Sequence, residues 1–339
     1  MRPIASLAYR LAVFSSLGML AAGCSTTGTS SVAIAPNTTQ SAARGNVVAD
    51  RRASEGLLRP PARAAHTRAG WISPDKRRHR KPALIYWGSY FNNTIDIFSA
   101  KGTNPPMKGQ ITSGLSNPER LFVDKTLSVY ATNLGNNTIT AYKRGATTPF
   151  LTISNGVNTP TGLTVDAAGT VYCANVGNNT VTVYPKGQTS PSHTISMSSS
   201  PQYLAIDSSD NLYVSTGIGV TEFAPGSGTG KNLGLTIGSP GALEVDKAGN
   251  IIVIDSSANT IDVFPAGQTA PSKQIAVTAG APFALSLNKA ETAVYASVEV
   301  SGGFIVQDVA YPNGTTMVNK ITTITDGDWP IAVSADAVL

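Results

Sequence analysis

The chain has 339 residues, 32 glycines, only two cysteines and a formal net charge of +5. The charge is divided unevenly. Residues 44–81 carry 11 basic and 3 acidic side chains, whereas residues 83–339 carry 12 basic and 17 acidic ones, which gives +8 and −5 for the two parts. The basic balance of the whole chain is therefore an average of unlike parts, and it does not indicate a nucleic-acid partner.

The N-terminal residues have the pattern of a secretory leader. Arg2 and Arg10 precede an apolar run over residues 11–22. A transmembrane helix needs about 20 apolar residues, so this run is too short to span a bilayer. The pattern predicts a signal peptide over residues 1–23.

The end of this leader, Leu-Ala-Ala-Gly-Cys at residues 20–24, resembles a bacterial lipobox. The resemblance implies cleavage before Cys24 and a diacylglycerol group on its thiol, so the protein is expected outside the cytoplasm and anchored to a membrane. Ser25, which is not acidic, favours the outer membrane if the source has two membranes. Ala21 stands where the lipobox leucine is expected, so cleavage without lipid attachment is the alternative.

Residues 24–82 are predicted to be a disordered tether, because they are rich in Ser, Thr, Ala and Arg and lack hydrophobic periodicity. Their densest basic run is Lys-Arg-Arg-His-Arg-Lys at residues 76–81. It is suited to anionic lipid head groups or envelope polymers. The simpler interpretation, which we favour, is a solvated spacer or a segment whose charges rest on the acidic propeller.

The rest of the chain repeats one pattern six times. Each copy has a proline, aliphatic residues three and five positions later, and Asp or Asn six positions later. The copies are residues 118–124, 160–166, 201–207, 240–246, 282–288 and 330–336. Such a period indicates a repeat architecture.

Each copy predicts four short strands. The alternating aliphatic residues form the first, and a second begins with an aromatic or aliphatic residue such as Tyr130 or Ile252. Glycine in the turn between them, as at residues 167–170 and 247–250, supplies positive φ. Asn-Asn-Thr at residues 136–138, repeated at 92–94 and 178–180, marks the next turn, because Asn tolerates left-handed geometry. Four strands in about 40 residues are typical of a β-propeller blade.

We therefore predict an all-β, six-bladed β-propeller of four-stranded blades over residues 83–339. Residues 84–86 match the second strand of a blade, but no first strand precedes them. Residues 329–339 contain a first strand with no second strand after it. The C-terminal strand is expected to complete the first blade and close the ring, which leaves no exposed sheet edge between blades.

The run Pro-Thr-Gly-Leu-Thr-Val-Asp-Ala-Ala-Gly-Thr-Val-Tyr-Cys-Ala-Asn at residues 160–175 resembles an NHL repeat, and the resemblance covers roughly residues 83–339. It implies a six-bladed propeller. Six-bladed propellers of related appearance include metal-dependent lactonases and lyases, whose ligands sit where the innermost strands enter the central channel.

The resemblance places two residues after each repeat proline at the channel mouth: Glu119, Arg120, Thr161, Gly162, Gln202, Tyr203, Gly241, Ala242, Phe283, Ala284, Ile331 and Ala332. This set has one carboxylate and no histidine, a poor donor set for calcium or catalytic zinc. No metal, cofactor or catalytic residue is therefore predicted. Glu119, Arg120, Gln202 and Tyr203 are predicted to bind a small polar ligand or a peptide end. The alternative is that Glu119 and Arg120 pair with each other and bind nothing.

Three other groups are predicted to be structural. Cys173, on a second strand, is expected to be a small buried hydrophobe. His193 falls on an outer strand and is expected to be exposed. The repeated aspartates at 124, 166, 207, 246 and 336 are expected to bind their own turns through backbone N–H groups.

The sequence thus predicts a monomeric binding module of the bacterial envelope, anchored through Cys24 and facing an unidentified protein, glycan or small-ligand partner. A hydrolytic or lyase-like enzyme on the same fold, of the lactonase kind, is the main alternative. A structural envelope protein is the second.

Overall fold

The computed structural model describes residues 82–301 and 303–322, and the backbone of residues 330–335. The chain divides into two units, Met1–Ala64 and Ala65–Leu339, and all described residues belong to the second. The predicted signal peptide, Cys24 and the tether up to residue 81 lie outside the described residues.

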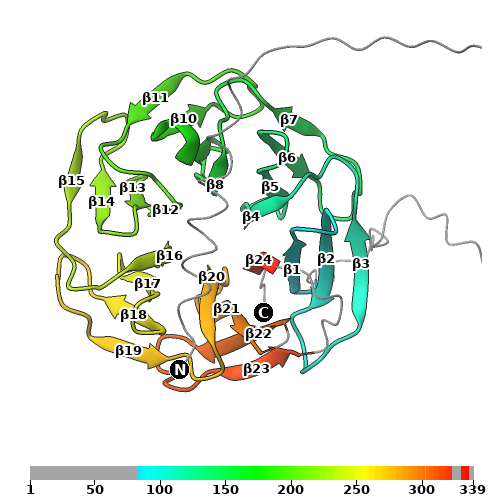
Figure 1. The fold of residues 1–339 in the computed structure, drawn as a ribbon, viewed down its shortest axis with the longest axis vertical. Coiled ribbons are helices and arrows are strands. Elements are labelled where there is room, and N and C mark those ends of the chain that lie inside the picture. The colour runs from blue at the N-terminus through cyan, green and yellow to red at the C-terminus, as the bar shows by residue number, and fades with distance from the viewer. Residues whose placement is uncertain (1–81, 302, 323–329, 336–339) are drawn as a thin grey trace, which may run out of the picture. The chain divides into compact units, whose positions relative to one another are not determined.

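The described residues form six antiparallel sheets of four strands each, arranged as blades around a ring (Figure 1). This confirms the predicted fold class. From the innermost strand outward, blade 1 contains β24 (Pro330–Ala335), β1 (Leu84–Ser89), β2 (Thr94–Ser99) and β3 (Met107–Ile111).

The other five blades follow one another in chain order. Blade 2 contains β4 (Pro118–Val123), β5 (Val129–Asn133), β6 (Thr138–Tyr142) and β7 (Leu151–Ile153), and blade 3 contains β8 (Pro160–Val165), β9 (Val171–Asn175), β10 (Thr180–Tyr184) and β11 (His193–Ser196). Blade 4 contains β12 (Tyr203–Ile206), β13 (Leu212–Ser215), β14 (Val220–Phe223) and β15 (Gly230–Asn232). Blade 5 contains β16 (Pro240–Val245), β17 (Ile251–Asp255), β18 (Thr260–Phe264) and β19 (Lys273–Ala276), and blade 6 contains β20 (Ala281–Leu287), β21 (Ala293–Val300), β22 (Gly303–Ala310) and β23 (Val318–Ile321).

The ring is closed by the last strand of the chain. β24 pairs antiparallel with β1, with Tyr86 opposite Ser334 and Trp87 opposite Val333. The innermost strands also touch in sequence around the ring, and β24 lies between β20 and β4. The prediction that a C-terminal strand completes the first blade is therefore confirmed.

The turns follow the local chemistry of the sequence. Asn93, Asn137, Asn179 and Asn259 have φ between 53° and 57°, which is left-handed geometry. Each comes directly before the third strand of its blade, where the sequence predicted such a turn. Asn fits there because its short polar side chain tolerates this conformation better than most residues.

The repeated aspartates hold the turn between the first and second strands. Asp166 Oδ1 accepts hydrogen bonds from the backbone N–H groups of Gly169 and Thr170, each at 2.8 Å. Asp124, Asp207 and Asp246 do the same in their own turns. The predicted structural role of these four carboxylates is confirmed, whereas Asp336 lies outside the described residues.

The core lies between neighbouring blades. Leu121 and Val123 of β4 pack in one cluster with blade 1 residues such as Tyr86, whereas Phe122 packs in another cluster with Leu163 of blade 3. This division follows from the alternation of side chains along a strand. It places Arg120 on the same side of β4 as Phe122. Because β4 is the innermost strand of blade 2, Arg120 also lies next to the centre of the ring.

Candidate binding site at the centre of the ring

A bulge after the repeat proline sets the direction of Arg120. Pro118 pairs with Asn133 and Arg120 pairs with Thr132, so Glu119 is an extra residue on the inner strand. A bulge of this kind re-aims the side chains beside it. The backbone N–H of Arg120 then donates to Thr132 Oγ1 at 2.9 Å, which fixes the strand after the bulge.

The Arg120 side chain reaches across the ring from blade 2. Its Nη2 donates to the carbonyl oxygen of Leu285 in blade 6 at 3.2 Å and lies 4.0 Å from Glu244 Oε1 in blade 5. Its Cζ lies 5.6 Å from the centre of the Tyr203 ring in blade 4, a cation–π distance. Figure 1 shows β4 and β16 on opposite sides of the centre. One arginine thus contacts three other blades.

Arg120 is deeply buried and incompletely paired. The residue is only 2% exposed. Its Nε and Nη1 atoms have no hydrogen-bond partner among the described residues. A buried cation with unused donors costs free energy unless water or an anion completes its hydrogen bonds. The guanidinium is therefore suited to accept an anionic group from outside the chain.

Glu244 is the carboxylate that faces this arginine. Burial raises its pKa to about 7, and this effect outweighs Arg120 and a backbone hydrogen bond from Leu287, which both lower it. Burial also lowers the pKa of Arg120, against the attraction of Glu244, Tyr203 and Glu119. The side chain of Glu244 keeps 20% of its exposure, so protons can exchange with solvent. Near neutral pH this site holds a permanent cation beside a carboxyl group that titrates.

The structure changes the depth predicted for two of the four candidate residues. Arg120 and Tyr203 were expected at the channel mouth, but they are 2% and 6% exposed and lie inside the ring. Glu119 and Gln202, which precede them, are half-buried. The difference arises because both residues belong to the regular part of an inner strand: Arg120 follows the bulge in β4, and Tyr203 is the first residue of β12.

Glu244 was missed by the sequence analysis, which considered only the two residues after each proline. It is the fourth residue after the repeat proline Pro240, and the equivalent residues after Pro118 and Pro160 are Phe122 and Thr164. Side-chain alternation places the second and fourth positions on the same side of an inner strand. An acid in that position, on the blade opposite Arg120, was the available signal.

Two residues predicted to be non-catalytic are where they were expected. Cys173 is fully buried, and burial raises the pKa of its thiol far above the usual range, so it does not form a reactive thiolate at neutral pH. His193 begins β11, the outermost strand of blade 3, and is exposed.

The side chains at the centre are poor ligands for a catalytic divalent cation. The two carboxylates there, Glu244 and Glu119, interact electrostatically with Arg120 and do not belong to a larger set of oxygen or nitrogen ligands. In the part of the chain that the structure describes, no three His, Cys, Asp or Glu side chains gather as a metal-binding group. No residue is therefore assigned as a metal ligand.

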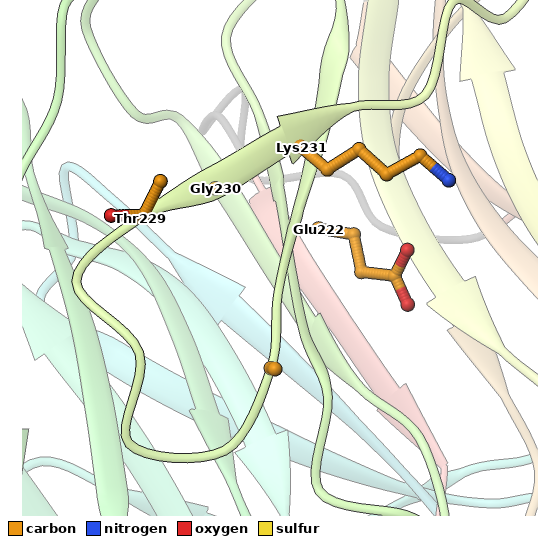
Figure 2. A pocket seen from close by; sticks show the side chains of 5 residues that line it. Glu222, Thr229, Gly230 and Lys231 are labelled. Carbon is orange, nitrogen blue, oxygen red and sulfur yellow. The ribbon is translucent and has the colours of Figure 1, made fainter.

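A shallow hollow of about 320 Å³ lies on blade 4, away from the ring centre. Figure 2 shows Glu222 and Lys231 side by side at this hollow, on the paired strands β14 and β15. Ala224, Thr229 and Gly230 form the rest of the wall. These are the third and outermost strands of the blade, and the hollow contains no buried polar group that lacks a partner. It is a weaker candidate than the Arg120 site.

Within the described ranges, no helix has the length and apolar character needed to cross a membrane.

No protein-family model matches the sequence, and no curated protein matches it. The NHL resemblance therefore stays a prediction. Solved structures match the fold. A chain of a nidogen/laminin complex has a TM-score of 0.62 at 13% identity, covering 75% of this chain and 98% of its own. A protein of unknown function from Bacteroides caccae has a TM-score of 0.59 at 10% identity, covering 76% of this chain and 100% of its own.

A streptogramin B lyase has a TM-score of 0.53 at 12% identity, covering 74% of this chain and 83% of its own. At such low identity these likenesses show the fold alone. The fold of this chain is thus shared with a chain of a nidogen/laminin complex and with a streptogramin B lyase.

Proposed function

We propose that this chain is a binding protein of the bacterial cell envelope, held at a membrane through lipid on Cys24. Its propeller takes a small ligand that carries a carboxylate at the centre of the ring. The single observation that carries this proposal is Arg120, which is 2% exposed and keeps Nε and Nη1 without partners among the described residues. Arginine is the natural partner of a carboxylate, because its planar fork can donate two parallel hydrogen bonds.

The neighbours of Arg120 support binding of a ligand rather than chemistry on it. Tyr203 offers a flat aromatic face beside the guanidinium, which suits the body of a small organic acid. The Leu285 carbonyl fixes one end of the arginine at 3.2 Å, so the group is held in place before a ligand arrives. A fixed donor lowers the entropic cost of binding.

Glu119 and Gln202 complete the proposal as outer contacts. Both are half-buried, directly before the two residues that lie inside the ring. In this arrangement they contact the part of the ligand that projects toward solvent. The ligand can be a small molecule or the C-terminal carboxylate of a peptide.

The test is a ligand screen on the purified full-length protein, with small carboxylic acids, amino acids and peptides, monitored by thermal shift. Compounds that stabilise the wild type should lose their effect in Arg120→Gln. Arg144→Gln is the matched control, because Arg144 is the other arginine after residue 81 and belongs to blade 2 outside the site. If Arg120→Gln keeps the full response, the ligand does not bind at the ring centre.

The enzyme alternative has its own readout. Hydrolysis of a simple lactone that is lost with a chelator, together with a divalent cation that remains bound through dialysis, would favour the lactonase-like reading over binding. A protein that stabilises with no compound and turns over none would favour the structural alternative.

A further inference from the structure

The single positive charge of Arg120 can neutralise either the carboxylate of Glu244 or the carboxylate of a ligand, but not both. Its Nη2 lies 4.0 Å from Glu244 Oε1, which is close enough for attraction between charges but beyond hydrogen-bond distance. Glu244 therefore influences the charge of the site without occupying the donors Nε and Nη1, which have no partner among the described residues. A ligand carboxylate on these donors would lie near the carboxyl group of Glu244.

The charges at the ring centre come from few groups. Across all six innermost strands, the ionisable residues are Glu119, Arg120, Tyr203 and Glu244. The inner strands β8, β20 and β24 contribute none. The turn aspartates at the strand ends accept hydrogen bonds from their own turns, as Asp246 does from the N–H groups of Ala248 and Asn250.

The charge state of Glu244 thus decides whether an anion is accepted. With Glu244 ionised, Arg120 already has a compensating charge, and an incoming carboxylate would leave an excess negative charge in a buried site. With Glu244 protonated, the carboxylate and Arg120 form a neutral pair. The protonated Glu244 can also donate a hydrogen bond, which an ionised carboxylate cannot.

We propose that the ring centre takes up a small carboxylic acid as two separate parts, its carboxylate on Arg120 and a proton from solvent on Glu244. This inference rests on the proposed function, because it requires Arg120 to be the ligand site. Where Glu244 is ionised before binding, one anion and one proton enter together, so the net charge does not change; at lower pH Glu244 already holds the proton and only the anion enters. Arg120 binds the carboxylate, and Glu244 makes this binding depend on pH because it must be protonated for the anion to be accepted.

The position of Glu244 makes this coupling effective near neutral pH. Burial raises its pKa to about 7 while Arg120 pulls it down. A carboxylate bound to Arg120 would remove much of that downward pull, so the pKa of Glu244 should rise further in the complex. Binding of the anion and of the proton are then linked, and each must favour the other equally.

The experiment is an acetate titration of the full-length protein between about pH 5.5 and 8.5, where acetate stays ionised and Glu244 changes charge. NMR of the arginine Nε–H signals follows binding at Arg120 directly. The expected Kd is constant well below pH 7 and rises by up to about tenfold per pH unit above it, because one proton is taken up per anion. Calorimetry in two buffers of different ionisation enthalpy should report the same proton uptake.

Glu244→Gln separates proton coupling from folding, because the amide keeps the size of the protonated acid. This variant should bind acetate with a Kd that no longer changes with pH, and Glu222→Gln, which removes a carboxylate from β14, should keep the wild-type profile. Thermal melts establish that both variants are folded.

The outcomes are distinct. If acetate binds at Arg120 with the same affinity at every pH, the coupling is wrong while the proposed binding site remains. If Glu244→Gln keeps the wild-type pH profile, another group takes the proton and the inference is wrong. If acetate binds at no pH, the inference is overturned, and the screen described above decides separately whether Arg120 binds a different ligand.

Discussion

Tyr311 donates a hydrogen bond to Asp246 across the boundary between two blades, with 2.5 Å between Oη and Oδ2. Tyr311 follows β22 of blade 6, and Asp246 follows β16 of blade 5. Burial alone would raise the pKa of Asp246, but hydrogen bonds from Tyr311, Asn250 and the backbone N–H of Ala248 outweigh it and lower the pKa. A turn aspartate that holds its own hairpin therefore also joins neighbouring blades.

Replacing Tyr311 with Phe should lower the free energy of unfolding at neutral pH by about 1.5–3 kcal/mol, the usual range for a hydrogen bond to a charged group. The folded-state pKa of Asp246 is lowered, so this stabilisation is present above the unfolded pKa and is lost as the pH falls through the folded value. The difference between Tyr311→Phe and wild type should therefore shrink below about pH 4. Urea denaturation at several pH values measures it.

Tyr172→Phe is the matched control, because the Tyr172 hydroxyl lies 3.4 Å from Asp166 Oδ2 within one blade. That longer contact should contribute less. If Tyr311→Phe and Tyr172→Phe lower the free energy of unfolding equally, the contact between blades has no special role.

Glu244 should make the stability of the protein depend on pH in the opposite direction. Its pKa is raised from 4.5 to about 7, so the folded state holds a proton that the unfolded state has released. Stability should fall as the pH rises from about 5 to 7, by an amount on the order of 3 kcal/mol, and should level off above that. Glu244→Gln should remove this slope. Melting temperatures across this range test the point, and an unchanged slope in the variant would contradict the assignment.

The closing strand should be essential for the stability of blade 1. β24 pairs with the inner edge of β1 from Ile85 to Ser89. Deleting residues 329–339 should cost at least about 3 kcal/mol, because it removes the pairing and exposes apolar side chains such as Trp87. Ser334→Pro, which places a proline opposite Tyr86, should weaken the same ladder by a smaller change. A truncated protein with the melting temperature of the wild type would contradict closure by this strand.

Membrane attachment should depend on Cys24. If the thiol carries diacylglycerol, Cys24→Ser should leave the leader uncleaved or release the mature protein from membranes, since serine cannot form the thioether. Fractionation and mass spectrometry of the N-terminal peptide measure this. A soluble wild-type protein without lipid would show that the leader is cleaved in the ordinary way.

The sequence predicted the fold because the propeller is built from local rules. Asn137 in the left-handed turn and Asp166 holding a hairpin act within a few residues of their own position, so a single repeat contains the information. Six copies of the pattern then specify the ring. Even the completion of blade 1 follows from counting which strands each end of the repeat array lacks.

The site was predicted only in part, because it forms between positions that are distant in sequence. Arg120 and Tyr203 were identified, but the contacts of Arg120 with Glu244 and Leu285 exist only once blades 2, 5 and 6 face one another. The repeat register does not show how far a long side chain crosses the ring. It also does not show that burial will raise the pKa of Glu244 to about 7.

The most direct test of a binding site on Arg120 is a crystal structure of the protein grown near pH 6 and soaked in bromide, whose anomalous scattering identifies the anion. An anomalous peak is expected within hydrogen-bond distance of Arg120 Nε or Nη1, and it should be lost in crystals of Arg120→Gln. Anomalous peaks confined to the outer surface, with only water on the Arg120 guanidinium, would contradict it.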